Sequence, residues 1–437
     1  MKTPHNGRSL FPAGRCIMRV LVSACGILLA FVPVCAAKGQ EAMRRPQQGQ
    51  KVSFATQVAP VLIDSCLSCH GGFETEAGFN LGSFPGLIRG GRGGAAIQPG
   101  RAADSLLVKK IRGKGIDGQR MPLGGPDLSD EVIDMIARWI DEGARLDVAG
   151  GDLQAVAAAG RSQALSEDDL AAVRRKAAVA LWKQVLPDES PEVASRGSLT
   201  VIANLPTARV ESLAVVAASA WDSIRERLVG EGGGRGASQS LIKGGIVLYA
   251  FARPYDFSEF WLAQQGSERP RGVTACVGSA GDVVYAAMVA PEDEIDAARP
   301  MAGDAAFVVT EQLASAVFAA RAAPSWFAQG AGRTLAALIA SKSPAARRWR
   351  KDLPEKLASV GSAEDFLAGR SDPAATASVA GGFVDRITMA GKKLPAMLAA
   401  LDAGTPFEEA FTEEFRGPPR SGFEAWAKQE AARNRRR

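Results

Sequence analysis

Cys66-Leu67-Ser68-Cys69-His70 is the stretch that decides how the first part of this 437-residue chain folds. Residues three apart on a helix share a face, so the thiols of Cys66 and Cys69 can point the same way. His70 follows them directly. Two such thiols can form thioether bonds to the edge of a haem while the next residue places an imidazole on its iron. The motif therefore predicts covalent haem attachment.

Three other interpretations of the two cysteines fit less well. A zinc site needs four ligands, but beyond this cluster and residues 1–37 the chain has only Cys276 and no further histidine. A thioredoxin-like pair belongs near a βαβ pattern, whereas the flanks here predict a short helix and a glycine-rich loop. A structural disulfide would leave His70 without a role.

Residues 1–37 have the order of a secretory signal peptide. An apolar run of 15 residues, Val20 to Val34, follows Arg15 and Arg19 and precedes Cys35-Ala36-Ala37, after which we expect cleavage. Such a run is short for a membrane span. We therefore expect export to the periplasm or another extracytoplasmic compartment, where c-type haem is attached. Two alternatives stay open, namely a start at Met18 and a leader retained as an anchor.

Composition and charge exclude several classes of function. The formal net charge is +5, but removing the four basic residues of the leader leaves +1. A nearly neutral chain gives no electrostatic reason to expect nucleic acid as a partner. His5 lies in the leader and His70 in the motif, and there are no other histidines. Ser-His-Asp hydrolysis and Cys-His proteolysis are therefore excluded for the mature chain.

Two methionines between residues 51 and 146 could be the second axial ligand of the haem. A His/Met pair raises the reduction potential and suits electron transfer. Met135 lies between Ile133 and Ile136 on a predicted amphipathic helix, which favours a place in the core. Met121 lies in a loop before Pro122 and is free to reach an iron. We favour Met121 as the ligand, and the alternative is that it fills a gap in the core.

Several segments between about residues 52 and 146 resemble the planctomycete-type cytochrome c domain. The matching segments are Cys66 to Gly71, Ala96 to Gly100, Ser105-Leu106, Arg120 to Pro122, Trp139-Ile140 and Gly143-Ala144. The resemblance implies a small all-α domain wrapped around one covalent haem c. It also implies that His70 is the proximal ligand and Met121 the sixth ligand.

The rest of the chain predicts a larger second domain. Residues 38–50 are a polar linker, and 147–197 form a helical connector with a capping-box-like start at Ser166 and Asp169. Strand-like segments rich in Val, Ile and Tyr then alternate with glycine-rich breaks, and the pattern is helical after Gly303. The strand-like segments are 198–203, 246–252, 273–277 and 283–289. This order predicts an α+β, mainly helical domain over 198–430, followed by a basic tail at 431–437.

A weaker resemblance covers Phe307 to Leu335, which is similar to the catalytic segment of gluzincin-type metallopeptidases of the peptidase MA superfamily. In this register Glu311 and Ser315 replace the two zinc histidines of His-Glu-x-x-His. Gln312 replaces the general base, and Gln329 replaces the ligand glutamate of Trp-x-x-Glu-Gly. The resemblance implies a metal-free pseudopeptidase without metallopeptidase activity, with Glu311 and Gln329 facing each other across a cleft. The alternative is an ordinary pair of amphipathic helices.

Together these features predict an exported c-type cytochrome that carries one haem and transfers electrons to an unidentified redox protein. Its C-terminal domain is expected to be non-catalytic, so an electron carrier is favoured over an enzyme. One alternative is a haem-containing binding or scaffold protein whose second domain holds a peptide or partner. Another is a redox enzyme with its substrate site in that domain. No stable membrane span is expected after cleavage of the leader.

Overall fold

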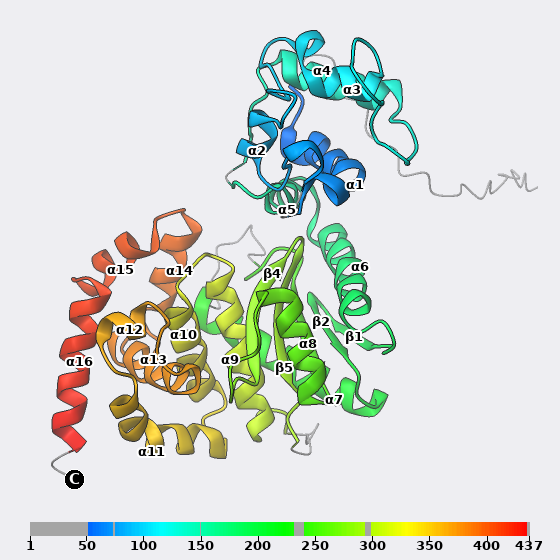
Figure 1. The fold of residues 1–437 in the computed structure, drawn as a ribbon. Coiled ribbons are helices and arrows are strands. Elements are labelled where there is room, and N and C mark those ends of the chain that lie inside the picture. The colour runs from blue at the N-terminus through cyan, green and yellow to red at the C-terminus, as the bar shows by residue number, and fades with distance from the viewer. Residues whose placement is uncertain (1–50, 73–74, 149, 231–239, 293–298, 435–437) are drawn as a thin grey trace, which may run out of the picture. The chain divides into compact units, whose positions relative to one another are not determined.

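The computed structural model describes residues 51–72, 75–148, 150–230, 240–292 and 299–434 (Figure 1). The predicted signal peptide and the polar linker lie outside these residues. Within them, no helix is both long enough and apolar enough to cross a membrane. The predicted fold class is confirmed, because an N-terminal helical region precedes a mainly helical part with one five-stranded sheet.

The N-terminal region consists of short helices around a hydrophobic core of its own, which runs from Val52 to Ala157. Its α-helices are α1 (Ala59–His70), α2 (Phe84–Arg89), α3 (Leu106–Arg112), α4 (Asp130–Asp141) and α5 (Leu153–Ala164). Three single turns complete it, η1 (Phe54–Val58), η2 (Glu76–Gly78) and η3 (Ala102–Asp104).

Helix α4 supplies the central apolar face of this region, as its sequence period predicts. Ser129 caps it, since its hydroxyl accepts a hydrogen bond from the backbone N–H of Val132. Ile136 and Trp139 on its inner face are fully buried or nearly so. The ring of Phe54 stacks on Trp139 at a centroid distance of 4.8 Å, which joins η1 to α4. The predicted helix is therefore confirmed.

Helix α5 extends the N-terminal core beyond residue 146, where the sequence pattern placed the start of the connector. Leu153 and Val156 are fully buried in that core. Gly160 lies so close to η1 that an added Cβ would be 2.6 Å from the Cβ of Ala55. Only glycine allows this approach. The first helix of the predicted connector thus packs as part of the N-terminal region.

The sheet has the strand order β1-β2-β3-β5-β4. Its strands are β1 (Glu192–Arg196), β2 (Leu199–Ala203), β3 (Ile246–Phe251), β4 (Ala275–Ala280) and β5 (Val283–Val289). The central strands β2, β3 and β5 are parallel, and β1 and β4 pair antiparallel at the two edges. Strands β2, β3 and β5 match the predicted segments, and β4 overlaps the predicted 273–277 but extends to Ala280. The sequence pattern missed β1, because this exposed edge strand has only Ala194 buried.

Helices cover both faces of the sheet. They are α6 (Glu167–Val185), α7 (Thr207–Val229), α8 (Pro254–Gln265) and α9 (Asp304–Ala319). Leu248 of β3 contributes to the large core shared with α7 and α9, whereas its neighbours Val247 and Tyr249 pack with α6 and α8. Successive residues of a strand point to opposite faces, so the buried run of β3 serves both cores.

The remaining helices form the C-terminal bundle. They are α10 (Ser325–Ile339), α11 (Pro344–Ser359), α12 (Ala363–Leu367), α13 (Pro373–Ile387), α14 (Leu394–Asp402), α15 (Phe407–Phe415) and α16 (Pro419–Asn434). Helix α10 packs against both α9 and α13. Trp326 of α10 is almost fully buried and contacts aromatic rings of α13 and α15, among them Phe383 and Phe411.

The first residue of α9, Asp304, ties that helix to α11. Its carboxylate accepts hydrogen bonds from the hydroxyl of Ser343 at 2.6 Å and the backbone N–H of Ala345 at 2.7 Å, and Arg348 donates a third. Burial alone would raise the pKa of Asp304, but these donors hold it below its ordinary value of 3.8. Because the pKa of Asp304 is lower in the folded state than in the unfolded chain, its carboxylate stabilises the fold above pH 3.8. This stabilisation is lost as the pH falls through the pKa of the folded state.

We therefore expect Asp304→Asn to lower the free energy of unfolding by about 1.5–3 kcal/mol at neutral pH, as for a hydrogen-bonded charge. The difference from the wild type should shrink as the pH falls below 3.8. Urea unfolding at neutral and acid pH measures both values. Asp222→Asn is the control, because the Asp222 side chain is 71% exposed. A difference for Asp304→Asn that stays constant into the acid range would contradict this role.

Candidate functional site

The Cys-x-x-Cys-His motif occupies the last turn and a half of α1. Pro60 lies in the first turn of the helix, where its missing N–H is not needed. Leu62 is buried in the N-terminal core, and Cys66 and Leu67 pack against it. The helix ends at His70, so packing of α1 positions all three predicted haem-binding residues of the motif together.

The two thiols differ in exposure. Cys66 is half-buried and Cys69 is exposed, and both are free thiols in this structure. Burial, and secondarily the nearby Cys69, raise the pKa of the Cys66 thiol to about 11. Cys66 is therefore protonated at neutral pH. The interaction between the two groups agrees with the shared helix face that the spacing predicts.

His70 has a ring nitrogen that the protein leaves without a partner. Its Nδ1 atom is buried and makes no hydrogen bond within the described residues, and the ring lies 5.2 Å from the ring of Phe79. The backbone carbonyl of His70 accepts the N–H of Leu81 at 2.6 Å, which fixes the end of α1. Buried polar atoms are nearly always satisfied, so such an atom needs an explanation. Two free thiols and an imidazole at the end of one helix fit a covalently held haem.

Gly71 lets the chain turn away directly after His70. A Cβ at this position would lie 2.6 Å from the backbone oxygen of Leu67. Any larger residue would therefore push against the last turn of α1. The chain leaves the helix here and comes back to His70 through Phe79 and Leu81.

Met121 lies in the loop between α3 and α4. Its backbone N–H donates to the carbonyl of Lys110 at 3.0 Å, and the preceding Arg120 is anchored by an ion pair with Asp127 at 2.8 Å. The Met121 side chain is half-buried. Met135, by contrast, packs against the N-terminal core, as its sequence position predicts. No hydrogen bond or ring contact among the described residues joins Met121 to the α1 motif, so its role as sixth ligand stays a prediction.

Residues 66–122 are similar to planctomycete cytochrome C. The match begins at Cys66 and ends at Pro122, so it contains both the haem motif and Met121. The predicted resemblance is thereby confirmed over these residues, and it implies a c-type cytochrome domain that holds haem. No curated protein matches the chain.

The residues of the gluzincin-like register lie on α9 and α10, outside the cytochrome c-like domain. Glu311 of α9 is only 4% exposed. Its two carboxylate oxygens accept hydrogen bonds from Nε and Nη2 of Arg333 on α10 at 2.9 and 3.1 Å. Arg333 Nη1 also donates to the hydroxyl of Ser378 on α13 at 2.8 Å. The Glu311 carboxylate thus pairs with a guanidinium and is closed off from solvent, whereas the resemblance implied an open cleft between it and Gln329.

Ser315, which stands in place of the second zinc histidine, has a hydrogen-bond partner within its own helix. The Ser315 hydroxyl donates back to the carbonyl of Glu311 at 2.7 Å, within α9. Gly332 packs against this point, since an added Cβ would lie 2.1 Å from Ser315 Oγ. In the part of the chain that the structure describes, no three His, Cys, Asp or Glu side chains lie close enough to hold a metal ion.

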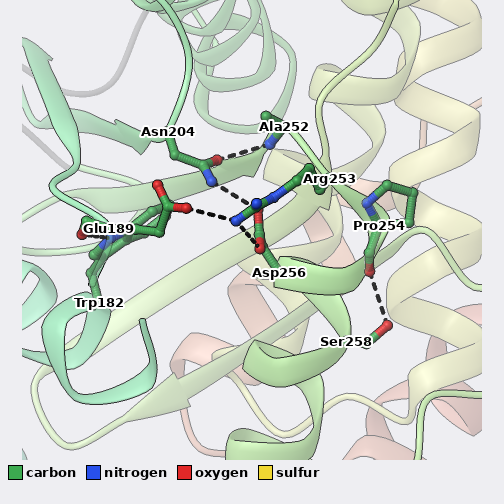
Figure 2. Close-up of polar contacts among 8 residues, drawn as sticks. All are labelled: Trp182, Glu189, Asn204, Ala252, Arg253, Pro254, Asp256 and Ser258. Atoms are coloured by element: carbon green, nitrogen blue, oxygen red, sulfur yellow. Dashed lines mark hydrogen bonds and ion pairs between the residues drawn. The ribbon is translucent and has the colours of Figure 1, made fainter. Parts of the chain in front are cut away.

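The structure also shows a polar cluster that the sequence analysis missed (Figure 2). Asn204 directly follows β2, Arg253 follows β3, and Asp256 lies in the first turn of α8. Asp256 is 1% exposed and accepts hydrogen bonds from Asn204 Nδ2 at 2.8 Å and from Arg253 Nε at 2.9 Å. The sequence signal for this cluster was a polar residue soon after each of two strand-like segments, Asn204 after β2 and Arg253 two residues after β3. The carboxyl ends of parallel strands meet at one edge of a sheet, so such residues can lie close together.

The polar side chains of this cluster form hydrogen bonds with one another and with the backbone. Asn204 Oδ1 accepts the backbone N–H of Ala252 at 2.8 Å, and Glu189 accepts Arg253 Nη2 at 2.6 Å (Figure 2). These bonds join the turn after β2 to the turn after β3. The cluster therefore stabilises the carboxyl edge of the sheet, and we assign it no ligand.

Proposed function

We propose that this protein is an exported c-type cytochrome that transfers single electrons. One haem is attached through thioethers to Cys66 and Cys69, with His70 as proximal ligand and Met121 as sixth ligand. The observation that carries the proposal is the placement of Cys66, Cys69 and His70 together at the end of α1, in a segment similar to planctomycete cytochrome C. The haem, when bound, supplies the iron that takes up and releases the electron.

Each of the four haem-binding residues has its own role in this proposal. Cys66 and Cys69 hold the haem edge against the exposed end of α1, so that the group cannot dissociate. His70 supplies the nitrogen ligand at a fixed position, because the Leu81 N–H holds its backbone. The Met121 thioether raises the reduction potential, as Met does in His/Met cytochromes. The electron goes to an unidentified redox protein in the periplasm or another extracytoplasmic compartment, as the leader at 1–37 favours.

We propose further that the C-terminal domain performs no peptide hydrolysis. The support is the pairing of Glu311 with Arg333, which places a fixed positive charge beside the one carboxylate of the gluzincin-like register. Catalytic zinc needs three protein ligands and an open position. Gln312 is an amide and cannot accept a proton from water. The domain would then be a pseudopeptidase attached to an electron carrier.

Separate alanine substitutions of Met121 and Met135 test which methionine is the sixth haem ligand. Met121→Ala is expected to lower the midpoint potential in a redox titration and to open a site that binds carbon monoxide, because the sixth ligand is lost. Met135→Ala should leave the potential near that of the wild type and lower the free energy of unfolding, because Met135 packs against the N-terminal core. An unchanged spectrum for Met121→Ala, with loss of the sulfur–iron band in Met135→Ala, would reverse the assignment.

A further inference from the structure

A pocket of about 290 Å³ lies in the C-terminal bundle, and none of its lining residues belongs to either candidate centre described above. It is formed where the end of α13, the start of α14, the end of α15 and the first turn of α16 meet. Its walls include Ile387, Lys393, Phe411, Phe415, Arg416 and Ser421. The volume is just below the usual range for ligand pockets, about 300–1,000 Å³. A ligand of about ten non-hydrogen atoms is the appropriate scale for this volume.

Ile387, Phe411 and Phe415 form the apolar part of the pocket wall. Phe411 is 1% exposed and its ring lies 4.6 Å from that of Phe415. The Lys393 ammonium lies 5.4 Å from the centre of the Phe415 ring and forms an ion pair with Glu414 at 3.2 Å. Glu414 therefore balances the charge of Lys393. The aromatic and aliphatic side chains suit an apolar ligand body.

Arg416 contributes a second positive charge to the pocket, and Glu414 pairs with Lys393 rather than with Arg416. Its side chain is exposed, and its guanidinium forms no hydrogen bond or ion pair with any other residue in the described segments. Arg416 follows α15 with φ 60° and ψ 38°, a left-handed conformation that favours glycine at a helix end. A non-glycine residue in this conformation is unfavourable on its own. This conformation fixes the backbone of Arg416, which is one of the residues that line the pocket.

We propose that this pocket binds a small monocarboxylate with an apolar body, such as an arylacetic or branched aliphatic acid. The apolar body packs on Ile387 and Phe415, which line the pocket and are partly exposed. The carboxylate pairs with the Arg416 guanidinium, whose planar donors match a carboxylate in bidentate geometry. A single unbalanced cation matches a single negative charge, and the small volume excludes a folded partner. No residue of the haem motif lines this pocket, so the inference goes beyond the proposed electron transfer.

Isothermal titration calorimetry on the full-length holoprotein tests this inference with three probes, namely phenylacetate, isovalerate and the neutral phenylacetamide. We expect at least one acid to bind, and phenylacetamide to bind at least tenfold more weakly than phenylacetate. Arg416→Gln should weaken binding of the acid at least tenfold, and Arg416→Lys should restore part of it. Arg420→Gln is the matched control, because Arg420 pairs with Glu424 on the next turn of α16 and does not line the pocket.

Arg416→Gly separates a binding role from a folding role. Glycine adopts the left-handed conformation without strain, so this variant should melt no lower than the wild type while losing the acid. No heat with either acid at millimolar concentration would overturn the inference. So would equal affinity for phenylacetate and phenylacetamide, or unchanged binding in Arg416→Gly. None of these outcomes depends on the haem, so failure here leaves the proposed electron transfer standing.

Discussion

Cys66→Ala combined with Cys69→Ala is expected to yield a protein that loses all its haem to acid–acetone extraction, whereas the wild type keeps it. The two thiols are the attachment points in our account, and no other thiol lies on α1. Each single variant should keep one thioether and therefore retain haem. Soret absorbance before and after extraction, together with the intact mass, measures the loss for each variant.

Cys276→Ala is the control for this experiment. Cys276 lies in β4, far from the motif in sequence. Burial raises the pKa of its thiol to about 12, so the thiol is protonated at neutral pH. Its removal should leave both the haem content and the mass increment unchanged. Covalent haem in the double variant would show that another group attaches it. Loss of haem in Cys276→Ala alone would point to the same conclusion.

Arg333→Met is expected to lower the free energy of unfolding by about 3–5 kcal/mol, because it leaves the buried carboxylate of Glu311 without its partner. Burial raises the pKa of Glu311, and the Arg333 guanidinium opposes that rise. The double variant Glu311→Leu/Arg333→Met should recover most of the loss, since replacing both charges with apolar groups removes the desolvation penalty. Urea unfolding of the four proteins in this cycle gives the coupling energy.

Arg420→Met provides the matched surface control for this cycle. Arg420 and Glu424 form an ion pair with side chains 64% and 55% exposed, so its loss should cost less than about 1 kcal/mol. Strictly additive losses at Glu311 and Arg333 would contradict a closed ion pair between α9 and α10. Stoichiometric zinc in the purified full-length protein would contradict the non-catalytic assignment and favour the metallopeptidase interpretation.

The features that the sequence predicted are those with a local signal. The haem motif spans five adjacent residues, and a single helical turn brings its thiols to one face. Helix α4 has an apolar period and a Ser129 cap, both of which are local. Strands β3 and β5 are continuous apolar runs and β2 is interrupted only by Thr200, as expected for parallel strands covered on both faces.

The features that the sequence did not predict depend on tertiary contacts. Glu311 and Arg333 are 22 residues apart and meet only because α10 packs on α9. Strand β1 has polar residues at most positions and forms because β2 offers an edge to pair with. The pocket at Arg416 needs four helices to come together. The sheet-edge cluster at Asp256 likewise joins turns that follow different strands.

The central claim of covalent haem at α1 is tested most directly by peptide mapping of the wild-type protein. The full chain would be expressed with haem-maturation machinery, extracted with acid–acetone, digested and analysed by mass spectrometry. We predict that the peptide containing Cys66 to His70 carries the mass of one haem, and that no other peptide carries it. An unmodified peptide with two free thiols, from protein produced alongside a control cytochrome that is correctly matured, would contradict the account.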